Sequence, residues 1–156
     1  RARDVKDRHF EIAISTPDRV ASAVLSVSTN GKGFFEITRD IARFVAEASA
    51  REGLVTVFTR HTSASLTIQE NADPDVLVDL ATALDRLAPE GGWRHEMEGA
   101  DDMPAHIKSM LTGTFLQIPV TRGALALGQW QGVFLVEHRR RPHRREVVLQ
   151  FIGSCR

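Results

Sequence analysis

The spacing of hydrophobic and polar residues changes along the chain and predicts both strands and helices. Alternating apolar residues indicate a half-buried strand over residues 10–14, and the apolar composition of residues 20–27 indicates a second strand. Asn30-Gly31-Lys32-Gly33 then predicts a turn, because Asn and Gly both accept positive φ. Residues 54–59 are apolar and β-branched, which predicts a third strand, and residues 64–69 either extend it or pair with it.

Two helices are indicated between and after these strands. Thr38 is a candidate N-cap, residues 39–51 place apolar side chains at helical spacing, and Gly53 is a candidate C-cap. Asp73-Pro74 predicts the start of the second helix, because Asp caps the first turn and Pro needs no N–H donor there. The apolar stripe of this helix comprises Val76, Leu77, Leu80, Ala83, Leu84 and Leu87.

The last third of the chain changes to short strands, after a short third helix that is expected to start near Asp102 and to carry His106. Four strands are predicted there, at residues 114–120, 125–127, 133–138 and 146–152. A basic segment with Pro142 joins the last two as the tip of a hairpin. Such short connections require antiparallel neighbours. The predicted fold class is therefore α+β, with an antiparallel β-sandwich-like core, two to three flanking helices and a single domain over residues 1–156.

The charges balance in number but are unevenly distributed. Twenty Lys and Arg residues stand against twenty Asp and Glu residues, so the formal net charge is zero, which argues against a general nucleic-acid or membrane-surface binder. Residues 69–102 nevertheless contain ten acids and two bases, whereas residues 138–145 contain five arginines, two histidines and no acid. These segments are either two solvated faces or a site where cations and anions meet.

Neither export nor membrane insertion is predicted. The charged N-terminus has no apolar stretch behind it, and no apolar run approaches the roughly 18 residues of a membrane span. The single cysteine, Cys155, excludes an internal disulfide and a CxxC site. The expected compartment is the cytoplasm.

Three histidines are the candidate metal ligands. His61 follows a predicted strand, while His95 and His106 lie on either side of the acidic pair Asp101-Asp102. Imidazole is a common ligand of zinc, nickel, iron and copper, and three imidazoles leave one coordination position for water or substrate. Because the three are scattered along the chain, the alternative stays open that each is a surface or hydrogen-bonded core histidine.

Two further segments allow more than one interpretation. Trp130 lies between the glycines of Gly128-Gln129-Trp130-Gln131-Gly132, where it either faces a ligand or fills the core beside a bulge. The arginines of residues 139–145 either bind phosphate in a bidentate manner or form a solvated hairpin tip.

Several spaced strings, taken together, resemble one family. They are Arg60-His61-Thr62-Ser63-Ala64, Glu70-Asn71-Ala72-Asp73-Pro74-Asp75-Val76, Arg94-His95-Glu96, Gly99-Ala100-Asp101-Asp102-Met103-Pro104-Ala105-His106, Gly123-Ala124-Leu125-Ala126-Leu127-Gly128-Gln129-Trp130-Gln131-Gly132, and Glu137 with the arginines that follow it. In this order they resemble the YjbQ family, also called the secondary thiamine-phosphate synthase family. The resemblance runs from about Gly31 to the C-terminus.

The resemblance implies a compact β-rich sandwich with flanking helices, assembled as a homotrimer. It implies a cleft where His61, His95 and His106 gather and hold a divalent metal such as zinc. It also implies a thiamine-phosphate synthase activity, in which a pyrimidine diphosphate couples to a thiazole phosphate and pyrophosphate leaves, with magnesium accompanying the diphosphate. Two positions depart from the family pattern: Gln129 stands where Thr is frequent, and Pro104 where an acid is frequent.

These considerations give each candidate residue an expected role. Glu70, Asp101 and Glu137 are the candidate catalytic carboxylates, and Asp101 is expected to orient a histidine. The candidate substrate-binding residues are Trp130, Gln131 and Arg145. The expected function is coupling of small phosphorylated substrates. The alternative is a non-catalytic protein that binds a metal or a phosphate ligand and whose synthase activity is incidental.

Overall fold

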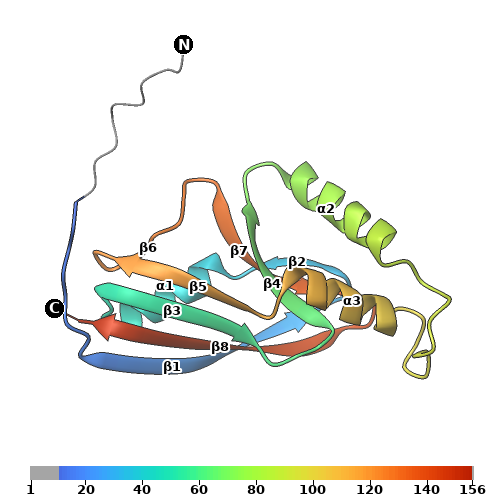
Figure 1. The fold of residues 1–156 in the computed structure, drawn as a ribbon, viewed down its shortest axis with the longest axis horizontal. Coiled ribbons are helices and arrows are strands. Elements are labelled where there is room, and N and C mark those ends of the chain that lie inside the picture. The colour runs from blue at the N-terminus through green and yellow to red at the C-terminus, as the bar shows by residue number, and fades with distance from the viewer. Residues whose placement is uncertain (1–10, 156) are drawn as a thin grey trace, which may run out of the picture.

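The structure, a computed structural model, describes residues 11–155. Its strands are β1 (Arg19–Thr29), β2 (Gly33–Glu36), β3 (Glu52–Thr59), β4 (Ala64–Glu70), β5 (Phe115–Thr121), β6 (Ala124–Leu125), β7 (Gln131–Glu137) and β8 (His143–Ser154). Its helices are α1 (Thr38–Glu47), α2 (Pro74–Leu87) and α3 (Asp102–Thr112). The strands form one sheet of order β1-β8-β3-β5-β6 and a smaller sheet of order β2-β7-β4 (Figure 1). All pairings are antiparallel, so the predicted α+β class is confirmed.

The hydrophobic core lies between the two sheets. Side chains alternate along the strands, so Val55 and Val57 of β3 are fully buried while Phe58 faces outward. The helix α1 closes this core with Ile41 and Val45, which are also buried. No helix within the described residues is long and apolar enough to cross a bilayer.

The ends of α1 differ from the sequence prediction. Thr38 is the first residue of the helix rather than its cap, and its side-chain oxygen accepts a hydrogen bond from the backbone N–H of Val133 in β7 (2.9 Å). Gly53 is not a C-cap but lies within β3, with φ of 155°. A Cβ at this position would lie 2.3 Å from the carbonyl oxygen of Ile152. The close approach of β3 and β8 therefore requires glycine here.

The helix α2 begins as predicted but packs less closely than its apolar stripe suggests. The Asp73 carboxylate accepts a hydrogen bond from the backbone N–H of Asp75 (2.9 Å), and Pro74 occupies the first turn. None of the residues of α2 is fully buried, and Leu87 is 68% exposed. Figure 1 shows α2 standing out from the sheets beyond α3.

The predicted strand at residues 10–14 is wrong over residues 11–14, the part that the structure describes. Residues 11–18 form no strand, and Ile12 and Ile14 are largely exposed, while Phe10 lies outside the described residues. An alternating pattern forms a strand only where a neighbour accepts its hydrogen bonds. No strand among residues 11–155 pairs with this segment.

The predicted hairpin of the last two strands is also wrong. β7 pairs with β2 and β4, whereas β8 pairs with β1 and β3. Residues 138–142 therefore carry the chain from the smaller sheet to the larger one. In the same way β4 pairs with β7 in the smaller sheet and neither extends β3 nor pairs with it.

Candidate metal site

His95, Asp102 and His106 bring their donor atoms together at the start of α3. One ligand atom from each lies within 4.8 Å of the other two, and this is the one group of its kind in residues 11–155. Asp102 Oδ2 lies 2.7 Å from His95 Nε2 and 3.3 Å from His106 Nε2. Asp102 and His106 are four residues apart on α3 and share one helix face, while His95 comes from the preceding loop. We call these three residues the histidine–aspartate group.

Surrounding hydrogen bonds orient this group. His106 Nδ1–H donates to the carbonyl oxygen of Thr62 (2.9 Å), which leaves the Nε2 lone pair facing Asp102 and His95. Arg139 Nη1 donates to Asp102 Oδ1, so the other carboxylate oxygen is left for the histidines. Burial alone raises the pKa of Asp102, but the hydrogen bond with His95 and the charge of Arg139 outweigh it. The pKa of this carboxyl is therefore lowered, and the group keeps an ionised donor.

Asp101 points away from the histidines. Its Oδ2 accepts hydrogen bonds from Arg139 Nε (3.3 Å) and from the backbone N–H of Arg140 (2.9 Å). Burial raises the pKa of Asp101, but these two partners outweigh it and the net pKa is lowered. The carboxylate that contacts the histidines is Asp102, not Asp101 as predicted. The spacing of four residues to His106 is the sequence signal that distinguishes the two.

His61 lies outside the histidine–aspartate group. Its Nε2 accepts a hydrogen bond from the backbone N–H of Glu146 in β8 (2.8 Å). Burial, and then the charge of Arg145, lower the pKa of this imidazole. The predicted meeting of three histidines is therefore not found in the described chain, where Asp102 provides the third donor.

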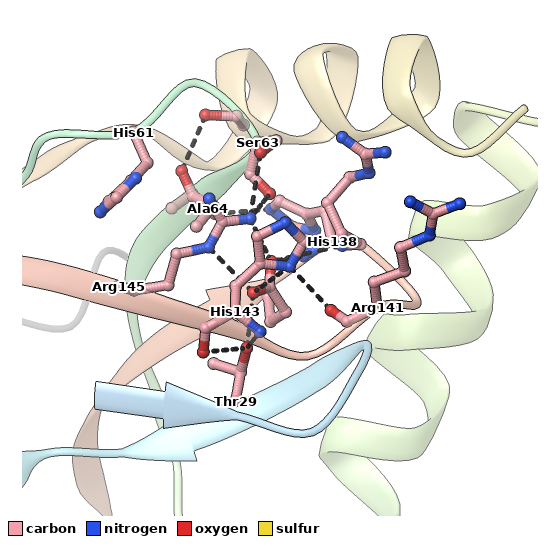
Figure 2. Close-up of polar contacts among 12 residues, drawn as sticks. Thr29, His61, Ser63, Ala64, His138, Arg141, His143 and Arg145 are labelled. Carbon is pink, nitrogen blue, oxygen red and sulfur yellow. Dashed lines mark hydrogen bonds and ion pairs between the residues drawn. The ribbon is translucent and has the colours of Figure 1, made fainter. Parts of the chain in front are cut away.

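Glu137, the last residue of β7, and Arg145, near the start of β8, form a buried ion pair. Arg145 Nη2 donates to Glu137 Oε2 (2.6 Å) and to Ser63 Oγ (3.0 Å), and Thr29 Oγ1 donates to Glu137 Oε1 (2.7 Å). Figure 2 shows Arg145 directed toward Ser63, with His143 and Thr29 nearby. Burial raises the pKa of Glu137, but the hydrogen bonds from Arg145 and Thr29 outweigh it and the net pKa is lowered. Both side chains are almost fully buried and are bound to each other.

The remaining predicted residues lie at the far end of the smaller sheet. Glu70, the last residue of β4, is opposite Gln131 at the start of β7. At about 3.3 Å per strand residue, Glu70 lies roughly 20 Å from Ala64, the end of β4 nearest the histidine–aspartate group. Trp130 is 58% exposed and does not fill the core. Within one chain these residues therefore do not reach the histidines.

A pocket with basic and acidic residues lies beside Arg139, which binds Asp102 of the histidine–aspartate group. It has about 790 Å³ of empty space and is lined by Glu96, Met97, Glu98, Gly99, Arg139, Arg141 and His143. Arg139 also donates to Asp102, so one lining residue of the pocket contacts the group. Arg141 is exposed, and its guanidinium donates no hydrogen bond to any residue of the range 11–155. Arg141 is therefore better placed than Arg145 to meet an anion.

Comparison with known proteins agrees with the fold and the motifs. The family model described as UPF0047 protein YjbQ-like matches residues 23–154. A UPF0047 protein of Synechocystis is 54% identical over 84% of this chain and 90% of its own length, and the YjbQ protein of Escherichia coli O157:H7 is 40% identical over 83% and 96%. The crystal structure of an uncharacterised YjbQ/UPF0047 protein from Clostridium acetobutylicum is 37% identical, covers 84% of this chain and 98% of its own, and superimposes with a TM-score of 0.74. These relatives are described by family and not by an activity.

Proposed function

The chain belongs to the YjbQ-like UPF0047 family, and we propose that its histidine–aspartate group binds a divalent metal ion. The hydrogen bond from His106 Nδ1 to the Thr62 carbonyl carries this proposal. It directs the second ring nitrogen toward Asp102 and His95, in the arrangement by which proteins orient metal-binding imidazoles. Asp102 is fixed in the same way by Arg139.

The donor set favours zinc among divalent metals. Two imidazoles and one carboxylate suit zinc, and three protein ligands leave a coordination position for water or substrate. A zinc ion held there supplies Lewis-acid polarisation of a phosphoryl or carbonyl oxygen. Arg141 lines the neighbouring pocket and would bind the substrate. Arg139 would hold Asp102 in place and neutralise its charge.

A small phosphorylated compound is the proposed substrate class. The pocket beside the metal donors carries the guanidinium of Arg141, and guanidinium groups bind phosphate oxygens in a bidentate manner. Coupling of a pyrimidine diphosphate to a thiazole phosphate, with release of pyrophosphate, is the reaction that we propose for it. The separation of Glu70 and the mutual pairing of Glu137 with Arg145 favour the second candidate, a metal- or phosphate-binding protein without catalysis, because neither of these two expected catalytic carboxylates lies free beside the pocket.

Replacing His106 with Ala is expected to weaken zinc binding by roughly 100-fold or more, since even the outer hydrogen-bond partners of metal ligands cost 10–100-fold. Isothermal titration of chelator-treated protein with Zn²⁺ measures this. His61→Ala is the matched control, and we expect its zinc affinity to stay within about twofold of the parent protein, because His61 lies outside the group. Equal affinities for the parent protein and His106→Ala would refute the site. A loss of zinc affinity in His61→Ala as large as that in His106→Ala would show that His61 is a metal ligand.

The two candidate functions differ in what the same variant does to product formation. If the metal serves catalysis, His106→Ala loses zinc binding and thiamine-phosphate formation together. If the protein only binds the metal, pyrophosphate release in the parent protein does not depend on zinc, and the variant leaves that rate unchanged.

We also propose that the chain assembles as a homotrimer through the outer face of its larger sheet. Apolar side chains form two cross-strand rows on this face, Val20–Ile152–Leu54 and Val24–Val148–Phe58–Phe115, and all of them are exposed except Val148, which is half-buried. Contiguous exposed apolar surface of this kind is typical of protein interfaces. Val24→Lys is expected to convert a trimer into monomers in sedimentation equilibrium, whereas Val78→Lys, at a similarly exposed valine of α2, is expected to leave the mass unchanged. A parent protein that sediments as a monomer would rule out this assembly.

A further inference from the structure

Lysine is rare in this chain, and both lysines of the described range meet at one carboxylate. Lys6, Lys32 and Lys108 are the lysines of the sequence, so arginine accounts for 17 of the 20 basic residues (20 − 3 = 17). Lys32 Nζ and Lys108 Nζ both donate to Asp85 Oδ1, at 2.7 and 2.5 Å. Lysine offers a compact ammonium with three rotatable donors, unlike the rigid planar guanidinium. Two compact cations thus share one oxygen atom.

This lysine cluster has spare donors and an unbalanced charge. Each ammonium has three N–H donors, and Asp85 Oδ1 is the one hydrogen-bond acceptor that residues 11–155 offer to either of them. The side chain of Lys108 is only 4% exposed, so water satisfies few of its donors. Two ammonium groups and one carboxylate leave a single positive charge. The neighbouring pairs Arg140–Glu90 and Arg145–Glu137 are each balanced internally. Asp101, the other carboxylate of the polar pocket, is bound by Arg139, which it shares with Asp102, and by the backbone N–H of Arg140.

The cluster lies where an apolar pocket joins a polar one beneath α2. The apolar pocket has about 340 Å³ of empty space, and its apolar walls are Phe34, Ala81, Leu84 and Val136. The polar pocket has about 630 Å³ of empty space and reaches Glu90, Asp101 and Arg140. Both pockets are lined by Lys32, Asp85, Lys108 and His138. A compound that enters through the polar pocket therefore meets the ammonium groups first and apolar walls behind them.

This site is separate from the histidine–aspartate group. Pro104 and Lys108 line the polar pocket, whereas Asp102 and His106 belong to the metal donors. At 100° per residue, Lys108 is turned by about 200° from His106 around the axis of α3. The two sites therefore use different faces of the same helix.

We propose that the pocket beneath α2 binds a small monocarboxylate with an apolar body. The carboxylate balances the single excess charge of Lys32 and Lys108 and accepts their spare N–H donors. The apolar body displaces water from the walls formed by Phe34, Leu84 and Val136. Concave sites with mostly apolar walls and a few convergent polar groups are typical small-molecule sites. The loose packing of α2, which has no fully buried residue, lets that wall adjust to the ligand.

Benzoate is the probe, and its affinity is measured by calorimetry or ligand-observed NMR on chelator-treated protein. We expect benzoate to bind at least 10-fold more tightly than acetate, which lacks the body, or benzyl alcohol, which lacks the charge. We expect Lys108→Met to weaken benzoate at least 10-fold. Ala81→Phe fills the apolar pocket and should weaken benzoate while leaving acetate unchanged. Arg86→Met, on α2 but outside the lining, is the matched control and should bind benzoate as the parent protein does.

Several results would overturn the proposal. One is benzoate binding that Lys108→Met and Lys32→Met leave unchanged; the half-exposed Lys32 provides this test even if Lys108→Met does not fold. Another is tighter binding of phenyl phosphate than of benzoate, which would contradict the charge argument. Benzoate affinity should be the same in His106→Ala as in the parent protein, so failure of the metal site and failure of this pocket are distinguishable.

Discussion

Arg145→Met is expected to lower the free energy of unfolding by about 3–5 kcal/mol, which is the typical effect of removing one partner of a buried ion pair. The variant leaves the Glu137 carboxylate, which is 1% exposed, without its cationic partner. Thr29 and the backbone N–H groups of His138 and Arg139 still donate to Glu137, but they carry no full charge. Urea unfolding at pH 7 and fixed protein concentration measures the change.

Arg144→Met is the matched control for this experiment. Arg144 precedes Arg145 on β8, is exposed, and donates to the Ser26 hydroxyl. Changes at exposed residues of this kind are usually within about 0.5 kcal/mol. A loss for Arg145→Met no larger than that for Arg144→Met would show that the pair is not a structural requirement. Arg145 would then be available as the phosphate ligand that the sequence suggests.

Lowering the pH from 6.5 to 5 is expected to destabilise the protein through His138. This side chain is buried, and its Nε2 lies 2.7 Å from Ser65 Oγ. Burial, and then the charge of Lys108, lower the pKa of His138 from its ordinary 6.5 to about 3. Between these two pH values the His138 imidazole is protonated in the unfolded chain but neutral in the folded protein, so stability falls as the pH falls. Each pH unit in this window costs up to about 1.4 kcal/mol.

His138→Gln removes the ionisable imidazole while keeping a side chain that can form a hydrogen bond with Ser65. Unfolding free energies are measured for both proteins at several pH values between 7 and 5. The difference between them should shrink, or change sign in favour of the variant, as the pH falls, because only the parent protein has the neutral buried imidazole. Parallel curves over this range would mean that the folded protein protonates His138 as readily as the unfolded chain does, which would contradict the lowered pKa.

Local signals predicted the starts of α2 and α3 and most of the strand segments, whereas sheet membership depends on distant residues. Asp73-Pro74 sets the start of α2 through a cap that needs only its own first turn. The connection at residues 138–142 is short enough for a hairpin, but β8 is bound by β1 and β3 over its full length. That choice rests on pairing with strands that lie far away in the sequence, at residues 19–29 and 52–59, and hydrophobic periodicity gives no information about such pairing. The strand predicted at residues 10–14 has the right alternation but no pairing strand in the described chain.

The candidate site was predicted only in part, because some of its contacts are local in sequence and others join distant residues. His95 and His106 are close in sequence to each other, and α3 completes the geometry with Asp102. His61 shares the residue type, yet its position is decided by a backbone N–H of β8 at Glu146. Glu137 and Arg145 were expected to face substrate, but both are buried and pair with each other. Residue types therefore indicated which side chains could bind a metal or an anion. Only the fold determines which of these side chains lie next to one another.

Zinc-edge anomalous diffraction from crystals of the chelator-treated protein soaked with Zn²⁺ tests the metal site most directly. We predict one strong peak about 2.0–2.2 Å from His95 Nε2, His106 Nε2 and Asp102 Oδ2, with the fourth position held by a non-protein ligand. His61 should contribute no bond to it. Full occupancy of zinc at another place in the chain, with the histidine–aspartate group empty, would contradict the assignment.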